Sequence, residues 1–528
     1  MVAGWTLVSR LTGFGRVAVT AAVLGPTYFG NTYQVTNTLP NTVYYGLLAG
    51  ALVSSILVPA LVQHIDRGDR ESSERVAGGS LGIVLVGLIA VIPVVLLAAP
   101  VLLQWAAAGA GQGAAAGQER VTRLFLLMLL PQVFLYAVVG CSSAVMNAHR
   151  RFALAAAAPA LENVGCIAVL LLTAQLYGGR TELATVPTGE LLLLGLGTTG
   201  AVALHAATQW YGARRAGVAL RPRAGWRDPE VTGVLRRAVP ALAQTALHAV
   251  QTLAVLVVAN RVAGGIVAYQ VAANFFFLPI AMGATPVAVS LLPRLSRLHQ
   301  AGDERLFRDT LVRGLRFALF VAMPAAVVLA VLAPVLATAV SFGRMSAEGG
   351  EAMVAATLLV LAPGVLGETA FLVGTYASYA RGDTRSPLRS MLVKFSTCVA
   401  LLAVALTARG PAVAPMAGLA VAVGAGAGAV HRISALLRGL PPGGERLLPA
   451  VLRTALAAGL MAGPLWVGAR LLAPVTGQLG ALAGAALVCL LGGTAYLGVQ
   501  ALLRAPETGW VLGALSQRRA AYDSRGAP

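Results

Sequence analysis

Ionisable side chains inside long apolar runs of the sequence are the residues that could carry chemistry. Two of them, Arg10 and Arg16, belong to the first run, and Glu162, Glu368 and Lys394 belong to later ones. A charge costs roughly 3 kcal/mol at the centre of a bilayer on insertion scales, so a charged residue in a membrane span usually faces a cavity or a partner. These residues therefore predict polar sites inside a membrane-embedded protein.

No constellation of residue types that supports catalysis is visible. The sequence lacks a Gly-rich phosphate-binding loop, a metal-spaced His and Cys cluster, and a nucleophile with a nearby base. The four cysteines fall inside apolar runs, as small buried side chains do. His248, the deepest histidine of the second half, suits either a packing role or a protonatable one. We therefore expect a protein that is not an enzyme and uses no metal.

The two arginines of the first run suit an anionic ligand. On a helix they lie about 9 Å apart along the axis and about 120° apart around it. Guanidinium groups make forked contacts with phosphate oxygens, so the pair predicts a binding site for an anionic headgroup such as a diphosphate. The alternative for Arg10, which lies near the N-terminus, is that its side chain extends to the membrane interface.

Composition indicates which elements position these side chains. Of the 528 residues, 57% are hydrophobic and 11% are charged, whereas a soluble protein has about 25% charged residues. A membrane-spanning helix needs about 20 apolar residues. The apolar runs therefore predict an all-α integral membrane protein with about fourteen transmembrane helices, at residues 3–25, 31–62, 76–105, 121–147, 153–177, 190–211, 238–261, 265–291, 314–342, 352–380, 387–408, 412–431, 447–472 and 478–503.

Prolines inside the predicted spans indicate helix breaks. Proline removes a backbone hydrogen bond, and in a transporter the freed carbonyl must be satisfied by a neighbour or by water. The sequence therefore predicts breaks at Pro40, Pro93, Pro324 and Pro363.

The arginines between the spans predict the topology. The net charge of +19 comes largely from short basic clusters in alternate loops, such as Arg150 and Arg151 after the fourth span. The intervening loops are nearly bare. By the positive-inside rule, both termini are expected in the cytoplasm. A nucleic-acid-binding protein would gather its basic residues in one patch, so no nucleic-acid partner is expected.

Short motifs recur in the sequence and indicate a duplication. Gly68-Asp69 is matched by Gly302-Asp303 and Ala99-Pro100 by Ala333-Pro334, both at an offset of 234 residues. The spans then divide into two six-helix lobes in a parallel repeat plus two C-terminal helices. The alternative is independent use of Pro and Gly in an Ala- and Leu-rich chain. The predicted parts are an N-lobe at 1–211, a basic linker at 212–237, a C-lobe at 238–440, a helix pair at 441–505 and a cytoplasmic tail at 506–528.

The motifs of the first 440 residues resemble those of one family. These motifs are Ser9-Arg10-x-x-Gly13-Phe14-x-Arg16, Leu39-Pro40-Asn41, Met146-Asn147, Ala158-Pro159-x-Leu161-x-Asn163, Leu292-Pro293-x-Leu295-Ser296-Arg297 and Arg381-Gly382-Asp383-Thr384-x-Ser386-Pro387. In this order and combination they resemble the MurJ/MviN lipid II flippases, members of the multidrug/oligosaccharidyl-lipid/polysaccharide exporter superfamily.

The resemblance implies a V-shaped bundle in a bacterial plasma membrane whose central cavity is lined by helices 1, 2, 7 and 8. It implies outward movement of an undecaprenyl-diphosphate-linked peptidoglycan precursor by alternating access, without a cofactor. A coupling cation (Na⁺ or H⁺) or the membrane potential would supply the driving force. Membrane lipids and cell-wall synthesis proteins are the other expected partners, and the last two helices would hold the lipid tail.

Two groups of site residues are expected. The headgroup would contact polar side chains of the cavity, and a second polar network would serve coupling. The expected headgroup residues are Ser9, Arg10, Arg16, Asn31, Asn41 and Asn274. The expected coupling residues are Glu162, His248 and Glu368.

The sequence departs from the family pattern at several cavity positions. Tyr44-Tyr45 stands where the second helix usually carries an arginine, Asn31 replaces an acidic residue, and Ala273-Asn274 stands near an expected arginine of the eighth helix. The alternatives to lipid II transport are therefore a paralogue that exports another lipid-linked polymer or a specialised metabolite, and a non-transporting scaffold of cell-wall assembly. A cation-coupled drug exporter is least favoured.

Overall fold

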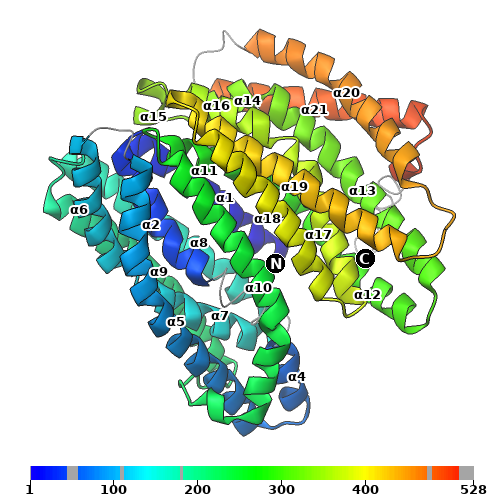
Figure 1. Cartoon of the computed structure of the whole chain (residues 1–528), viewed down its shortest axis with the longest axis horizontal. Coiled ribbons are helices and arrows are strands. Elements are labelled where there is room, and N and C mark those ends of the chain that lie inside the picture. Colours follow the sequence, from blue (N-terminus) through cyan, green and yellow to red (C-terminus); the bar gives the residue numbers. More distant parts are fainter. Residues whose placement is uncertain (1, 45–56, 108–111, 179–181, 473–477, 510–528) are drawn as a thin grey trace, which may run out of the picture. The chain divides into compact units, whose positions relative to one another are not determined.

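The computed structural model describes residues 2–44, 57–107, 112–178, 182–472 and 478–509. In these ranges the chain forms helices joined by short turns and contains no β-strand (Figure 1). Twelve described helices are long and apolar enough to cross a membrane, and a thirteenth crossing results if one bent pair counts as one span. The predicted all-α membrane fold is therefore confirmed. The predicted span 31–62 contains residues 45–56, which lie outside the described ranges.

The chain forms two compact units. Unit 1 comprises Met1–Val271, Ser341–Met353 and Leu401–Ala417, and unit 2 comprises Ala272–Val340, Val354–Ala400 and Gly418–Pro528. Four helices contribute residues to both units: α11 (Gly265–Pro279), α16 (Gly350–Leu361), α18 (Arg385–Ala405) and α19 (Val413–Arg438). The division into lobes with the boundaries expected from the sequence stays a prediction.

Unit 1 contains nine described α-helices in chain order, the start of a tenth, and several shorter pieces. These are α1 (Val2–Leu24), α2 (Tyr28–Tyr44), α4 (Val58–Asp66), α5 (Arg70–Ala107), α6 (Gln112–Leu129), α7 (Gln132–Ala148), α8 (Phe152–Tyr177), α9 (Thr188–Arg215), η3 (Gly225–Arg227), α10 (Pro229–Ala259), the first half of α11 (Gly265–Pro279), α15 (Arg344–Ala347) and η5 (Gly410–Ala412).

Unit 2 contains the later helices. These are the second half of α11, the π-helical turn η4 (Ile280–Ala284), α12 (Thr285–Gln300), α13 (Glu304–Val331), α14 (Ala333–Val340), most of α16 (Gly350–Leu361), α17 (Gly364–Ala380), most of α18 (Arg385–Ala405), most of α19 (Val413–Arg438), α20 (Leu447–Leu472) and α21 (Gln478–Leu502).

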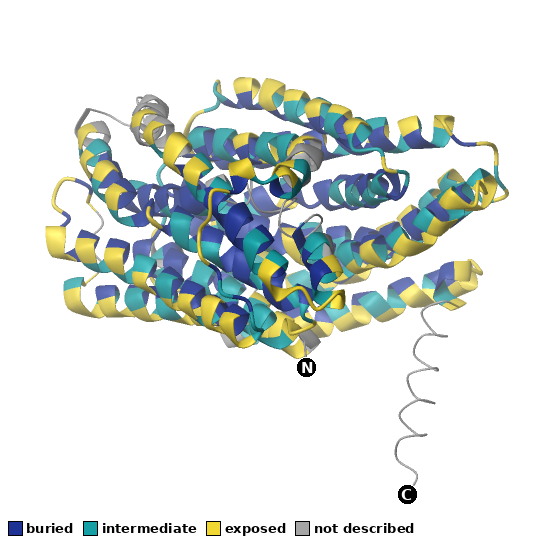
Figure 2. Cartoon of the chain, turned by 90° about the horizontal axis from the view of Figure 1, so that it is seen from below, coloured by how far each residue is buried: buried dark blue, intermediate teal, exposed yellow. Residues whose placement is uncertain are grey.

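Buried residues run along one side of many helices and exposed apolar residues along the other (Figure 2). A soluble protein would cover that outer side with charges, whereas here leucines such as Leu97, Leu171 and Leu490 are more than half exposed. Lipid is the solvent that suits this surface. Each of these helices therefore packs one face against its neighbours and exposes an apolar face that suits lipid.

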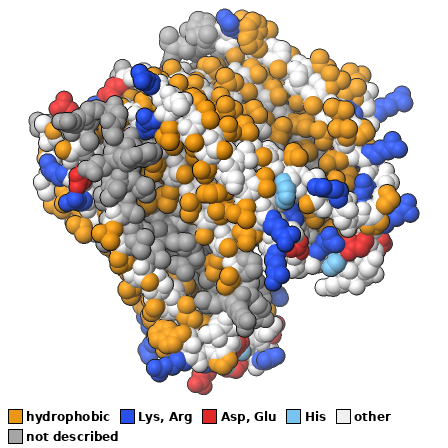
Figure 3. Space-filling model, in the orientation of Figure 1, with side chains coloured by type: hydrophobic (Ala, Val, Ile, Leu, Met, Phe, Trp, Pro, Cys, Tyr) orange, Lys and Arg blue, Asp and Glu red, His pale blue; other side chains and the backbone are white. Residues whose placement is uncertain are grey.

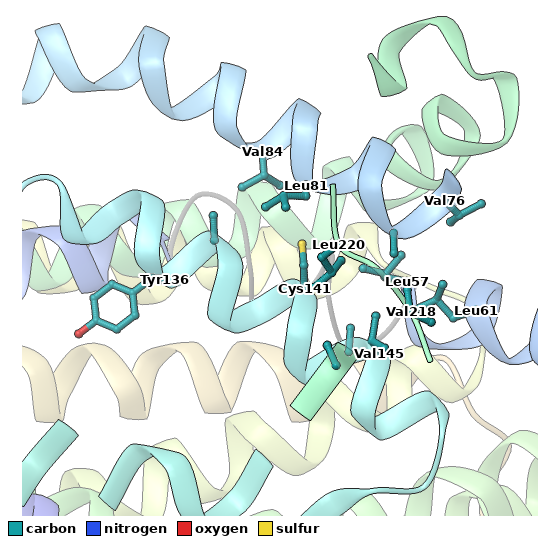
Figure 4. Close-up of a cluster of buried hydrophobic side chains, with 14 of the residues drawn as sticks. Leu57, Leu61, Val76, Leu81, Val84, Tyr136, Cys141, Val145, Val218 and Leu220 are labelled. Atoms are coloured by element: carbon teal, nitrogen blue, oxygen red, sulfur yellow. The ribbon is translucent and has the colours of Figure 1, made fainter. Parts of the chain in front are cut away.

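One packed cluster of unit 1 joins α4, α5, α7 and the segment after α9 (Figure 4). Leu61, Leu81, Val145 and Leu220 are among its members, and each is at most 7% exposed. Tyr136 also belongs to the cluster, at the end where α7 faces α8. Burying a side chain of this size stabilises the fold by about 1.5–3 kcal/mol. The cluster thus fixes the position of α7, and α7 carries Tyr136, a residue of the site described below.

A Gly-Asp turn occurs three times and joins consecutive helices in the same way. Gly68, Gly302 and Gly382 have φ angles of 71°, 73° and 69°, which favour glycine. The aspartate that follows each glycine accepts a hydrogen bond from a backbone N–H three residues later, at 2.9 Å in every case. The glycine ends one helix and the aspartate caps the next. The first two turns are those that the sequence relates by the 234-residue offset.

Replacing Asp383 by alanine should lower the stability of the protein by about 1 kcal/mol, because α18 loses its N-cap. Burial raises the pKa of the Asp383 carboxyl, but hydrogen bonds from Ser386 and from the Arg385 backbone outweigh that effect and lower it. A carboxyl with a lowered pKa contributes stability above its unfolded pKa of about 3.9, and this contribution is lost as the pH falls through the folded value.

Thermal unfolding in detergent at pH 7 and at about pH 3 tests this. We expect Asp383→Asn, which can still cap, to unfold close to the wild type at pH 7 and to lose less stability between the two pH values. Equal melting temperatures for Asp383→Ala and wild type at pH 7 would contradict the assignment of the cap.

The proline-based prediction of helix breaks is right at one position and wrong at three. α16 and α17 meet at a 47° bend, and Pro363 is the N-cap of α17. α2, α5 and α13 continue through Pro40, Pro93 and Pro324. Pro131 is the N-cap of α7 just as Pro363 is of α17, and both helices have 17 residues.

Candidate functional site

Arg16 and Glu162 form an ion pair in unit 1. Arg16 lies on α1 and donates from Nη1 to Oε1 of Glu162 on α8, at 3.2 Å. The two side chains are 24% and 9% exposed, so the pair is largely shielded from solvent. A charge shielded from solvent is costly without a partner, so each residue offsets the cost of burying the other. Two residues selected separately from the sequence thus belong to one site.

Glu162 accepts hydrogen bonds from two further helices. Tyr136 on α7 donates its hydroxyl to Oε1 at 3.0 Å, and Nδ1 of His205 on α9 lies 2.7 Å from Oε2. Nε2 of His205 lies 3.4 Å from the Nε2 donor of Gln209. Four helices, α1, α7, α8 and α9, therefore meet at one carboxylate, which faces a guanidinium, a phenol hydroxyl and an imidazole.

Asn163 packs α1 against α8 next to this network. Its Nδ2 lies 3.3 Å from the backbone oxygen of Ser9 and 3.3 Å from Oγ1 of Thr12. A Cβ at Gly13 would lie 3.3 Å from the same nitrogen, so a side chain there would crowd the contact. The family-like motif of the first helix therefore also has a packing role, and Ser9 contributes its backbone oxygen to it.

The other headgroup residues predicted for the first two helices have different surroundings. Arg10 is exposed. Asn31 is fully buried on α2; it donates to the Val262 carbonyl at 2.8 Å and accepts from the Ile266 N–H at 3.0 Å. Both ends of its amide hold the turn between α10 and α11. Asn41 has a buried Oδ1 with no hydrogen-bond partner among the described residues, so it keeps an unused acceptor.

The remaining predicted residues are spread over the two units. Asn274 is half-buried on α11 in unit 2, and His248 is exposed on α10 in unit 1. Glu368 on α17 forms a 2.5 Å ion pair with Lys394 on α18. Lys394, the single lysine of the chain, is 2% exposed. Gly428 of α19 leaves room for the Lys394 side chain, because a Cβ at position 428 would lie 2.7 Å from the Cβ of Lys394.

Several charged residues of the helices were not predicted as site residues. Arg432 on α19 is 1% exposed, and its Nε and Nη1 are buried without a hydrogen-bond partner in the described ranges. His205 was not selected as a site residue either. A charged network links α13, α20 and the segment after α21 through Arg316, Arg453 and Glu507. Arg316 and Arg453 could have been selected from the sequence, because both are charged residues inside predicted spans. Their shared partner, Glu507, could not be predicted.

Within the described ranges, no three His, Cys, Asp or Glu side chains are grouped as ligands of a metal ion.

Comparison with solved structures identifies the class of fold. The fold is similar to that of a structure described as "Lipid II flippase MurJ, inward closed conformation", with a TM-score of 0.74, 15% identity, and coverage of 95% of this chain and 98% of that one. It is also similar to an inward-facing MATE family transporter of the MOP superfamily, with a TM-score of 0.63, 15% identity, and coverage of 81% and 95%. The chain is therefore a multi-pass membrane protein with a transporter fold.

Sequence comparison is more specific. Residues 20–482 match the family model described as "Lipid II flippase MurJ". A probable lipid II flippase MurJ of Vibrio cholerae is 27% identical over 416 residues, which cover 76% of each chain. The lipid II flippase MurJ of Burkholderia cenocepacia is 26% identical over 398 residues, which cover 74% of each chain. The chain belongs to the MurJ family, as its motifs predict.

Proposed function

We propose that this protein is a lipid II flippase that moves an undecaprenyl-diphosphate-linked glycan from the inner to the outer leaflet by alternating access. The observation that carries the proposal is the match to the MurJ family over residues 20–482. The whole-length structural similarity to a MurJ flippase supports it. We further propose a bacterial plasma membrane location, cytoplasmic termini and transport without catalysis. The basic loops support this orientation.

In the proposed mechanism, Arg16 is the cation that contacts the diphosphate. Its guanidinium already donates to Glu162, so the substrate must compete with that carboxylate. Forked contacts with two phosphate groups provide more acceptor oxygens than the single contact that Glu162 makes here. Ser9, Arg10 and Asn41 on α1 and α2 are the other proposed contacts, and cell-wall synthesis proteins are proposed partners.

We propose that a proton is the coupling cation. If His205 gains a second proton, its charge can neutralise Glu162 in place of Arg16, because the Nδ1 to Oε2 contact is already 2.7 Å long. Arg16 is then free to bind phosphate. The exchange couples proton uptake to substrate binding within one network. Glu368 already has the Lys394 ammonium as its counter-ion, so it is the less suitable coupling group.

Transport in proteoliposomes tests the proposed function. We expect movement of fluorescent lipid II across the vesicle membrane, reduced at least tenfold by Arg16→Gln, and a shift of its pH dependence in His205→Gln, which can still donate to Glu162 but cannot be protonated. His299→Gln is the matched control, because His299 pairs with Glu304 at the end of α12, apart from the network. A folded wild type that leaves lipid II in its original leaflet would exclude the proposal.

A second candidate, export of another lipid-linked glycan, is favoured by the reduced positive charge. Arg16 is partly neutralised by Glu162, and no charged residue occurs between Gly265 and Pro293. Attraction for a diphosphate is weaker than two further arginines would provide. The same assay separates the candidates if lipid II and undecaprenyl-diphosphate-linked O-antigen units are compared side by side.

A further inference from the structure

A pocket of about 360 Å³ lies between α12 and α13 in unit 2. Ser290, Leu291 and Arg294 line it from α12, and Thr310, Arg313 and Phe317 from α13. The two helices approach closely at its base because Gly314 has no side chain; a Cβ there would lie 2.2 Å from Cδ1 of Leu291. Arg294 and Ser290 are exposed, so the pocket opens to the surface.

The pocket lies where both helices change from apolar to charged sequence. No charge occurs from Gly265 to Pro293, and Arg294 is the first after them. In α13 the order is reversed: charges continue to Arg316, and none follows from Phe317 to Val331. This boundary is the level at which the polar headgroups of a bilayer begin. In Figure 3 basic side chains lie beside apolar ones in the region that α12 occupies in Figure 1.

The charge around the pocket is positive. Arg313 and Arg316 share Glu445, and Arg316 and Arg453 share Glu507, so three arginines face two glutamates. Arg294 adds another positive charge and has no ion-pair or hydrogen-bond partner among the described residues. These four arginines and two glutamates carry a net charge of +2, and Arg294, at the mouth of the pocket, is the arginine among them without a counter-ion in the described ranges.

The interior of the pocket contains an unused donor. Thr310 is 3% exposed, and its hydroxyl has no hydrogen-bond partner within the described ranges. A buried hydroxyl without a partner costs about 1–3 kcal/mol, so such groups usually have a ligand or a water molecule. Leu291 and Phe317 line the same pocket with apolar side chains.

We propose that this pocket binds the phosphate group of an anionic membrane lipid, with Arg294, Arg313 and the Thr310 hydroxyl around the phosphate and the acyl chains against Leu291 and Phe317. A phosphodiester supplies a negative charge that balances the excess positive charge of the arginines, at the depth where lipid phosphates lie. A soluble anion would use the arginines but leave the apolar walls uncovered. The site lies entirely within unit 2 and does not depend on the proposed transport activity.

The test is a titration of the purified full-length protein, in phosphatidylcholine nanodiscs, with short-chain phosphatidylglycerol, measured by calorimetry. We expect saturable binding that Arg294→Gln weakens about tenfold, the effect of losing one charge-assisted contact. Arg297→Gln is the matched control: Arg297 is exposed on the same helix but does not line the pocket. Thr310→Val should weaken binding several-fold and raise the melting temperature without lipid, because a buried unpaired hydroxyl is removed.

Each result decides the proposal. Saturable binding that is weakened by Arg294→Gln and kept in Arg297→Gln supports it. No saturable binding, or equal weakening in both variants, overturns it, since equal weakening indicates general attraction of positive charge. Competition by inorganic phosphate at the same concentration as the lipid would also overturn it. Displacement of phosphatidylglycerol by undecaprenyl diphosphate would support a lipid-phosphate site and identify the isoprenoid as its occupant.

Discussion

Replacing Glu162 by alanine is expected to leave little folded protein in the membrane. Glu162 is the shared acceptor of Arg16, Tyr136 and His205, and it is 7% exposed. Its removal leaves the Arg16 guanidinium shielded without a counter-ion. Breaking a buried ion pair in this way costs about 3–5 kcal/mol, a large part of a typical folding free energy of about 5–15 kcal/mol. Fluorescence-detected chromatography of the solubilised protein measures the loss.

Two variants separate charge from packing in this prediction. Glu182→Ala removes the same charge from an exposed loop position between α8 and α9, and we expect it to behave like the wild type. The double variant Arg16→Ala with Glu162→Ala should recover part of the folded fraction, because neither charge is then left unpaired. A stable Glu162→Ala protein with wild-type yield would show that Arg16 does not depend on this carboxylate.

Replacing Glu507 by alanine is the second change with a large expected effect. Glu507 follows α21, is 1% exposed, and accepts from Arg316 of α13 at 2.8 Å and from Arg453 of α20 at 2.7 Å. It therefore holds the C-terminal helix pair against α13 at one end. Without it two arginines lose their shared acceptor, and we expect a loss of about 3 kcal/mol.

Limited proteolysis together with thermal unfolding checks this second prediction. We expect faster cleavage in the connection between α19 and α20 and a lower melting temperature for Glu507→Ala. Glu71→Ala, at an exposed position in the first turn of α5, is the matched control and should change neither. Unchanged cleavage of Glu507→Ala would mean that apolar packing of α20 and α21, around residues such as Met461 and Tyr496, suffices to dock them.

The parts of the fold that follow local rules were predictable from the sequence. Apolar length gave the membrane-spanning helices, and the turns at Gly68 and Gly302 follow from glycine at positive φ with an aspartate after it. The breaks predicted at Pro40 and Pro324 are absent from the described helices α2 and α13, since neighbouring helices can satisfy the freed carbonyl. Proline therefore indicates where a break is permitted, and packing decides whether it forms.

The site was predictable only as separate residues. Arg16 and Glu162 were each selected because a charge in an apolar run needs a partner, but 146 residues separate them and the sequence gives no pairing. His205 was missed because one histidine in an apolar helix gives no signal until the fold brings it to a carboxylate. Asn31 shows the converse: a polar residue in a predicted cavity helix holds the α10–α11 turn with both ends of its amide.

The measurement that tests the account most directly is the leaflet distribution of lipid II in cells depleted of this protein. Lipid II exposed on the outer surface is cleaved by an added colicin-type hydrolase, whereas lipid II in the inner leaflet is protected. We predict that depletion protects newly made lipid II, that the wild-type gene restores cleavage, and that Arg16→Gln does not, although its protein reaches the membrane. Unchanged cleavage after complete depletion would contradict the proposal that this protein moves lipid II.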